Sequence, residues 1–359
     1  MPIVLNYTGA ENDRGGVVSV VRALASTERY ECILGVAPNF SQSRRPPLKF
    51  VCFAKIAHER IDLGTMIRGL AVAREVRTWL LSDPCRIYHG RSRAGLIVAL
   101  WLRLMGEKRA IASVHSLGRH KWFYRAAASI LGPRLFWLNP SMKRYYRVGD
   151  STWKGCLPDC VPESAWTSTR HRRSAIRPVH FGCVGSLVPV KQWELVLKAV
   201  ALLPAGVAVR ILHSGGQDGT PESAEYAAKL VKLADELGIS RSVDWLGENQ
   251  EMSSFYSKVD CLIVPSKWEA SSVAALEAAC AGVPLLASDE SGTRDLIEMA
   301  ECGWLFRSGS AKSLALEISS LASGTKYSDL RRKEDALLIF AAPAVADAHL
   351  KIYNALISD

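Results

Sequence analysis

The segment CLIVPSKWEASSVAALEAACAGVPLLASD, residues 261–289, contains the pattern that decides the fold of this chain. It begins with a short apolar run, passes through a polar loop, becomes rich in alanine and ends in a second apolar run. Ser271 and Ser272 favour the start of a helix, and Gly282 favours its end. This order of strand, loop, helix and strand is typical of a parallel α/β sheet. Such a unit places a helix N-terminus at the carboxyl edge of the sheet, where unpaired amides and the helix dipole attract a phosphate.

Two glutamates accompany this helix, Glu269 in the loop before it and Glu277 within it. Eight helical residues rise about 12 Å, whereas the two carboxyl groups of a glycosidase lie about 5–9.5 Å apart. The two carboxylates therefore serve different parts of one ligand. A nucleotide-sugar, which has phosphate in the middle and hydroxyls at both ends, has the required shape. Two solvated glutamates beside a core helix remain the alternative, which the pair alone would favour.

The segment resembles the donor site of retaining glycosyltransferases of the GT-B fold, family-4 type, whose pattern is Pro-Ser, Glu-x7-Glu, Ala and Gly-x-Pro. Three further motifs of that family follow its order along most of the chain. They are the glycine pair Gly15-Gly16 after an apolar run, the run 111–115 that ends in a histidine, and the stretch 181–191 with its glycine and terminal lysine. The resemblance implies an α/β protein of two Rossmann-like domains that face each other across a cleft.

The resemblance also assigns roles to individual residues. It implies that the catalytic residues are His115, Lys191 and Glu269, and that the donor-binding residues are Gly15, Gly16, Lys191, Ser272, Val273 and Glu277. Expulsion of a nucleoside diphosphate requires stabilisation of negative charge, which a lysine and backbone amides can supply. We therefore expect no metal site and no cofactor, and no Asp-x-Asp metal motif lies near the site. Each role has a structural alternative. Lys191 could be an exposed lysine without a ligand, Gly15-Gly16 an ordinary turn, and His115 a structural histidine.

Two positions depart from the family pattern. Ser186 stands where the family has an arginine after the glycine of the first loop, so one cation is missing from the expected diphosphate clamp. Either Lys191 works with an arginine from elsewhere or turnover is slow. The family's Pro-Asn-Gly-Val motif reads Pro-Asp-Cys-Val at 158–161, a change expected to alter the local turn more than the chemistry.

Alternating apolar and helical stretches predict two successive α/β domains. The expected boundaries are 1–161 for an acceptor-binding domain, 162–178 for a polar, basic linker and 179–342 for a nucleotide-sugar-binding domain. Residues 343–359 have a helical pattern, and the resemblance implies that this helix crosses back to the first domain. The predicted strands are 3–7, 32–36, 49–53, 86–89, 110–115 and 135–138, then 180–184, 207–213, 242–246, 261–264 and 285–288; the predicted helices include 16–25, 65–81, 94–105 and 122–131.

Length and cysteine usage agree with a cytoplasmic enzyme. The 359 residues are enough for two cores. Nine cysteines without metal-ligand spacing indicate reduced thiols and argue against zinc. No leading signal is evident, and the longest apolar helix candidate, 94–105, is too short to span a bilayer.

Charge is distributed unevenly along the chain. Residues 1–150 contain 24 Lys and Arg against 10 Asp and Glu, a balance of +14, whereas residues 151–359 have a balance of −4. A basic domain suggests a partner rich in phosphate. Because no nucleic-acid motif accompanies the charge, we expect an anionic membrane surface or an anionic acceptor rather than a nucleic acid.

The region 119–125 and its continuation mix cations with large aromatic residues, as interfacial helices do. This pattern predicts peripheral binding at the inner face of the cell membrane. The alternative places Trp122, Phe123 and Ile130 on the inward apolar face of a Rossmann helix, with the cations solvated.

Three functions are compatible with these patterns. The first is a retaining glycosyltransferase that moves a sugar from a UDP- or GDP-sugar to a glycan or lipid-linked acceptor, in cell-surface polysaccharide or lipopolysaccharide synthesis. The second is a nucleotide-sugar epimerase on the same fold, which needs additional acid and base residues. The third is a non-catalytic sugar-nucleotide-binding protein, which Ser186 alone supports.

Overall fold

The structure is a computed structural model that describes residues 1–13, 15–43, 47–54, 61–166, 178–248, 251–324, 326, 330 and 332–358. The chain divides into two compact units, each described here by itself. Unit 1 comprises Met1–Pro162 and Ile339–Asp359, and unit 2 comprises Glu163–Leu338. Most of the predicted linker, residues 167–177, lies outside the described residues.

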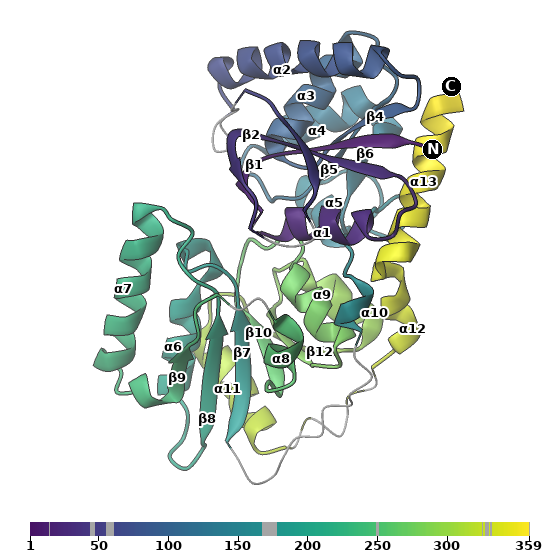
Figure 1. The fold of residues 1–359 in the computed structure, drawn as a ribbon. Helices are drawn as coiled ribbons and strands as arrows, with labels where there is room; N and C mark the ends of the chain where they lie inside the picture. The colour runs from purple at the N-terminus through teal and green to yellow at the C-terminus, as the bar shows by residue number, and fades with distance from the viewer. Residues whose placement is uncertain are drawn as a thin grey trace. The chain divides into compact units, whose positions relative to one another are not determined.

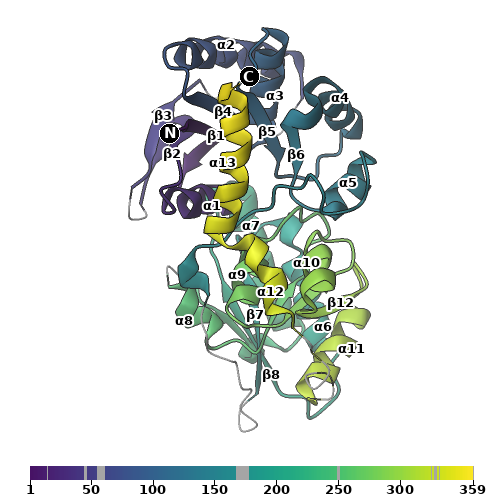
Figure 2. The ribbon, with the colours of Figure 1, turned by 90° about the vertical axis from the view of Figure 1, so that its right-hand side faces the viewer.

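Unit 1 contains a parallel six-stranded sheet in the order β3-β2-β1-β4-β5-β6, whose strands are all labelled in the second of the two ribbon views (Figures 1 and 2). Helices connect its strands, and α13 from the end of the chain packs beside α1 and β4 (Figures 1 and 2). The elements are β1 (Ile3–Asn12), α1 (Gly16–Ala25), β2 (Glu31–Ser41), β3 (Lys49–Cys52), α2 (Leu63–Leu81), β4 (Arg86–Gly90), α3 (Arg93–Leu104), β5 (Ala110–Val114), α4 (Lys121–Leu131), β6 (Leu135–Trp137), α5 (Pro140–Tyr146) and α13 (Ala342–Ser358).

Unit 2 contains a second parallel six-stranded sheet, in the order β12-β11-β10-β7-β8-β9. Its elements are β7 (Val179–Val184), α6 (Trp193–Ala201), β8 (Val209–Ser214), α7 (Pro221–Glu236), β9 (Val243–Trp245), α8 (Met252–Tyr256), β10 (Cys261–Val264), α9 (Val273–Cys280), β11 (Leu285–Ser288), α10 (Thr293–Ala300), β12 (Gly303–Phe306), α11 (Ala311–Ala322) and α12 (Glu334–Leu337).

Counted along each unit, both sheets have the Rossmann order 3-2-1-4-5-6. In this order the chain changes direction between the first and the fourth strand, and ligands bind at the carboxyl ends of those strands. The two switch points therefore lie between β1 and β4 in unit 1 and between β7 and β10 in unit 2. The predicted α/β class with two parallel sheets is confirmed.

All eleven predicted strands are present, and β12 is an additional one. The four residues of β12 begin with a glycine and show no alternation of apolar and polar residues, so no sequence pattern predicts a strand there. β1 extends beyond the predicted Tyr7 to Asn12, because it continues to pair with β2 through irregularities in register.

A buried polar network attaches α13 to the sheet of unit 1. The two ring nitrogens of His89 form hydrogen bonds of 2.7 Å with the hydroxyl of Tyr353 on α13 and the hydroxyl of Ser113 on β5. His349 on α13 lies 3.2 Å from the guanidinium of Arg91. Burial, followed by the nearby charge of Arg91, holds the pKa of His89 and of His349 well below the usual histidine value. Both imidazoles are therefore neutral in the folded protein.

Candidate active site

The loop after β7 places the predicted lysine at the switch point of unit 2. Gly185 begins this loop with φ +147°, and its amide donates to the carbonyl of Ser214 over 2.9 Å. A side chain at the facing Gly215 would come within 2.0 Å of the carbonyl oxygen of Gly185, so both positions require glycine. The loop ends in a single 3-10 turn, Pro189–Lys191, from which the lysine side chain projects.

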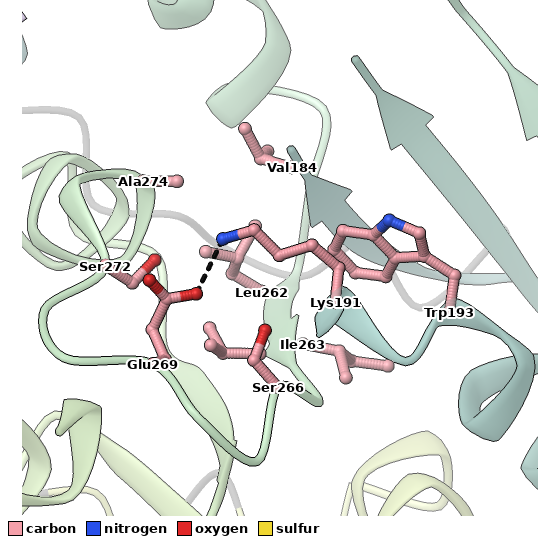
Figure 3. Close-up of a pocket in the computed structure, with 10 residues that line it drawn as sticks. Val184, Lys191, Trp193, Leu262, Ile263, Ser266, Glu269, Ser272 and Ala274 are labelled. Carbon is pink, nitrogen blue, oxygen red and sulfur yellow. Dashed lines mark hydrogen bonds and ion pairs between the residues drawn. The ribbon is translucent and has the colours of Figure 1, made fainter. Parts of the chain in front are cut away.

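Lys191 and Glu269 form an ion pair at this switch point. Their Nζ and Oε2 atoms lie 2.6 Å apart, with the side chains 25% and 15% exposed (Figure 3). The main-chain carbonyl of Glu269 accepts a hydrogen bond of 2.8 Å from the amide of Gly292, which fixes the loop. Both side chains line one pocket, whose other lining residues are Val184, Trp193, Leu262, Ile263, Val264, Ser266, Ser272 and Ala274. Two of the three predicted catalytic residues are therefore in direct contact.

The N-terminus of α9 lies against the same pocket. The hydroxyl of Ser272 caps the helix by accepting from the amide of Ala275 over 3.3 Å. The first amides of an α-helix, from Val273 onward, have no acceptor within the helix. Ser272 and Ala274 line the pocket, so the positive end of the helix dipole and the ammonium of Lys191 act on one site.

Glu277 is held by a tyrosine that the sequence analysis did not identify. Tyr256, on α8, is 3% exposed and donates its hydroxyl hydrogen to Oε2 of Glu277 over 3.0 Å. Burial, and then the charge of Glu277, raises the pKa of Tyr256 well above its usual value, so the phenol remains a donor. No local pattern could reveal this contact, because the residues are 21 positions apart on different elements.

Ser266 is a second residue to which the sequence analysis gave no role. It lines the pocket beside Glu269 (Figure 3) and is 2% exposed. Its hydroxyl oxygen has no hydrogen-bond partner among the described residues. A ligand hydroxyl or phosphate oxygen in the pocket would satisfy it.

Ser186, which replaces the family's arginine, is exposed in the loop after β7. Its carbonyl accepts a hydrogen bond of 3.0 Å from the indole of Trp193. The position thus contributes a structural main-chain contact and no charge, and the cation lining this pocket is Lys191.

The glycine pair lies at the switch point of unit 1. Gly15 has φ +99° and directly precedes α1, and both glycines are exposed. The buried carboxylate of Asp13 holds this turn by accepting from the amide and hydroxyl of Ser43, over 3.0 and 2.9 Å, and by pairing with Arg22. The turn therefore exposes the backbone of Gly15 and Gly16, whose amides can serve as donors to an anion.

His115 directly follows β5, two strands from β1 and so about 10 Å across the sheet. Its Nδ1 lies 3.3 Å from Oδ1 of Asp159, and both side chains are 5% exposed. This contact does not have hydrogen-bond geometry, and neither ring nitrogen has a hydrogen-bond partner among the described residues. The Pro-Asp-Cys-Val variant, which we expected to alter the local turn more than the chemistry, places a carboxylate beside the candidate histidine, and its effect on the chemistry remains a prediction.

The predicted site residues thus form two sets. Unit 2 contains Lys191, Glu269, Ser272, Val273 and Glu277, all at or beside one pocket or on its helix. Unit 1 contains the other three, at the carboxyl ends of β1 and β5.

The candidate interfacial helix, α4, is divided between core and surface. Phe123 is 5% exposed, whereas Trp122 and Ile130 are 64% and 42% exposed. The alternative that turns all three side chains inward is therefore wrong for Trp122 and Ile130. Lys121 lies 3.8 Å from the ring centre of Tyr145, and Arg125 donates to the carbonyl of Tyr146 over 2.8 Å.

No helix in the described part of the chain is long and apolar enough to cross a membrane. Among the same residues, no three His, Cys, Asp or Glu side chains are grouped so as to hold a metal ion. Independence from metal remains a prediction.

Comparison with known proteins relates unit 2 to a known family. Residues 170–335 match the family model described as Glycosyl transferases group 1. The matched residues lie within unit 2. A D-inositol 3-phosphate glycosyltransferase of Mycobacterium sp. (strain KMS) is 32% identical over 178 residues, which are 49% of this chain and 39% of that protein. A protein of the same description from Mycobacterium bovis (strain BCG / Pasteur 1173P2) is 36% identical over 111 residues, 30% of this chain and 22% of that protein. The chain thus spans less than half the length of the curated relatives that it matches.

Solved glycosyltransferase structures resemble the whole chain in fold. Sucrose-phosphate synthase from Thermosynechococcus elongatus matches with a TM-score of 0.79 at 16% identity, over 100% of both chains. Anabaena HepE in complex with UDP and glucose matches with a TM-score of 0.77 at 14% identity, over 99% of this chain and 100% of that chain. These likenesses confirm the GT-B glycosyltransferase fold.

Proposed function

We propose that this chain is a retaining glycosyltransferase that moves a sugar from a nucleoside diphosphate sugar to a glycan or lipid-linked acceptor. The observation that carries the proposal is the Lys191–Glu269 ion pair in a pocket at the N-terminus of α9. A cation and helix amides suit a diphosphate, and an adjacent carboxylate suits sugar hydroxyls. The UDP and glucose bound to the Anabaena neighbour make a uridine donor the first choice and a guanosine donor the second.

Each residue then has a defined role. Lys191 donates to the leaving diphosphate as negative charge develops on it, and the amides of Val273 and Ala274 stabilise the same charge. Glu269 accepts from hydroxyls of the transferred sugar once the phosphate has drawn Lys191 away from it. Glu277, oriented by Tyr256, accepts from the vicinal hydroxyls of the ribose. For unit 1, we propose that the exposed amides of Gly15 and Gly16 bind phosphate oxygens and that His115 contacts a sugar hydroxyl.

This arrangement predicts transfer without a metal ion. The positive charge that a divalent cation would supply to the leaving group comes from the ammonium and the helix dipole. The missing arginine at Ser186 leaves this clamp with one cation fewer than the family pattern, so we expect slow turnover.

The test uses the purified chain with UDP- and GDP-sugars in excess chelator. We expect release of nucleoside diphosphate and an α-linked product from an α-linked donor, assigned by the anomeric proton couplings. Loss of activity in chelator, restored by magnesium or manganese, would contradict the mechanism. Interconversion of free nucleotide-sugars without transfer would indicate the epimerase, and binding without turnover would indicate the non-catalytic protein.

We further propose that the acceptor is presented at an anionic membrane surface, in polysaccharide or lipopolysaccharide synthesis at the inner face of the cell membrane. The supporting observations are the exposed Trp122 and Ile130 on α4 and the surplus of +14 in residues 1–150. An exposed tryptophan next to cations suits the headgroup region, and each basic side chain near such a surface contributes about 1 kcal/mol.

Vesicle co-sedimentation tests the membrane proposal. We expect recovery on anionic vesicles, little on neutral ones, and loss at high salt. Replacement of Arg119, Lys121 and Arg125 by glutamine should reduce recovery. The matched control removes three exposed charges from α2, by Arg68→Gln, Arg74→Gln and Arg77→Gln, and should reduce recovery less. Equal recovery on both kinds of vesicle would refute the proposal.

A further inference from the structure

Asp159 is held in place on both sides by main-chain hydrogen bonds. The amide of Leu157 donates to the carbonyl of Trp137 over 2.8 Å, and the amide of Val161 donates to the carbonyl of Phe340 over 2.9 Å. The carboxylate between these two anchors is buried, and His115 is the side chain that it faces at 3.3 Å. The contact is therefore set by the backbone of unit 1 and not by a mobile surface side chain.

The chemistry of the two groups determines where the imidazole proton lies. An ionised carboxylate can only accept hydrogen bonds, whereas a neutral imidazole has one donor and one acceptor nitrogen. Nδ1 of His115 is the ring nitrogen that lies 3.3 Å from Oδ1 of Asp159, and neither atom has a hydrogen-bond partner among the described residues. A carboxylate that close favours the tautomer with the proton on Nδ1, since a small rotation of either side chain would then form the hydrogen bond. The acceptor is then Nε2, which is buried and has no hydrogen-bond partner among the described residues. A buried acceptor left unsatisfied destabilises the folded protein, and a ligand hydroxyl would satisfy it.

We propose that Asp159 is a positioning residue, which fixes the proton of His115 on Nδ1 and leaves Nε2 to accept a hydrogen bond from a hydroxyl of the transferred sugar. The inference rests on the proposed function for the identity of that ligand. The asparagine that the family motif has at this position could present either its oxygen or its amide hydrogens, so it would not select one tautomer. The departure from the motif thus gives this chain a more strictly oriented histidine.

The decisive experiment is nitrogen NMR of the protein with 15N-labelled histidine. The chain has eight histidines, and His115→Gln identifies the signal of interest by its disappearance. At about pH 8, where ordinary histidines are neutral, we expect a protonated Nδ1 and an unprotonated Nε2 in the parent. In Asp159→Asn, at least half of His115 should carry its proton on Nε2. The proposal would be overturned if His115 of the parent protein carried its proton on Nε2. It would also be overturned if the tautomer of His115 were the same in Asp159→Asn as in the parent.

The control variant is Asp150→Asn, which removes an exposed carboxylate of unit 1 that pairs with Lys143. It should leave the His115 tautomer and turnover unchanged. Asp159→Asn should lower kcat about tenfold, the equivalent of one hydrogen bond, with the donor KM changed less than twofold. A fall in thermal stability with unchanged kcat would assign a purely structural role and refute the proposal.

The two readouts separate this inference from the proposed function. The tautomer is measured without turnover, so a chain that transfers no sugar refutes the glycosyltransferase while the NMR result still decides the role of Asp159. If Asp159→Asn fails to fold, the tautomer of the parent alone decides it.

Discussion

The two units share one strand order but build their sites from different chemistry. At the switch point of unit 2, a charged pair, Lys191 and Glu269, lies in one pocket at a helix N-terminus. Around the switch point of unit 1, the candidate groups are the amides at Gly15 and Gly16 and the buried pair of His115 with Asp159. The topology fixes where a ligand can bind, and the residues that follow each strand decide which ligand it is.

The interiors of the two units also differ in chemistry. The core of unit 2 is mainly apolar, with Phe181, Trp193 and Leu286 at its centre. Its buried His213 lies against the rings of Trp193 and Trp245, and burial lowers the pKa of this histidine to about 4. Unit 1 instead contains the network of two neutral histidines that attaches α13. The attachment of α13 in unit 1 therefore depends on groups that acid can titrate.

Acidification should destabilise unit 1 more than unit 2. This difference is the largest effect that we expect. In unit 1, His89 and His349 have pKa values well below that of an unfolded histidine, about 6.5. The unfolded chain therefore binds more protons as the pH falls below about 6.5, and stability falls with it. Among the described residues, two such histidines lie in unit 1 and one, His213, lies in unit 2, so the free energy of unfolding should fall more steeply with decreasing pH in unit 1.

Hydrogen exchange followed by mass spectrometry resolves this difference by peptide. Protection of α13 and β4 should decrease at a higher pH than protection of β8 and α6. Replacement of His349 by glutamine should reduce the pH dependence of α13. If protection of β8 decreased at a higher pH than protection of α13, the network of His89 and His349 would not be the acid-sensitive part of the protein.

Removal of the carboxylate from the ion pair should have opposite effects on binding and transfer. Glu269→Gln releases Lys191 from a competing anion, so UDP should bind up to about fivefold more tightly, the scale of a partly exposed ion pair. The same change removes a charged acceptor from the sugar, and kcat/KM should fall about 10–150-fold. Isothermal calorimetry and initial rates on one preparation measure both. Weaker UDP binding with unchanged transfer would show that Glu269 orients Lys191 and does not contact the sugar.

Two buried tyrosines provide a matched comparison with the smallest expected effect. Tyr353→Phe removes the hydroxyl that bonds His89, and it should lower the free energy of unfolding by about 1–2 kcal/mol without changing UDP binding. Tyr256→Phe removes the donor to Glu277, and it should weaken UDP binding by about fivefold. Urea unfolding and calorimetry of both variants are the measurements. If both substitutions changed UDP binding equally, Tyr353 could not be assigned a purely structural role and Tyr256 a ligand-orienting one.

The sequence predicted those features that depend on neighbouring residues. The strand, loop and helix from Cys261 to Cys280 follow directly from an apolar run, a serine cap and an alanine-rich segment. The positions of Lys191 and Glu269 at a common edge follow from the rule that parallel strands end together. Strand β12 was missed because four residues with a glycine have no period to detect.

The sequence could not predict contacts between residues far apart in the chain. Lys191 and Glu269 are 78 positions apart, and their direct pairing depends on the turn at Lys191 and on the anchoring of Glu269 to Gly292. His115 and Asp159 meet because main-chain hydrogen bonds hold the 157–161 segment beside the end of β5. Such contacts depend on the tertiary course of the backbone, which no local pattern encodes.

The central claim is that unit 2 contains a nucleoside diphosphate site in which Lys191 binds the diphosphate and Glu277 binds the ribose. Calorimetry with UDP and GDP tests it on the parent, on Lys191→Ala and Glu277→Ala, and on the exposed control Lys198→Ala from α6. The account predicts that each site variant loses about 1.5–3 kcal/mol of binding free energy, the scale of a charged hydrogen bond, while Lys198→Ala binds like the parent. Parent-like binding by both Lys191→Ala and Glu277→Ala would contradict it.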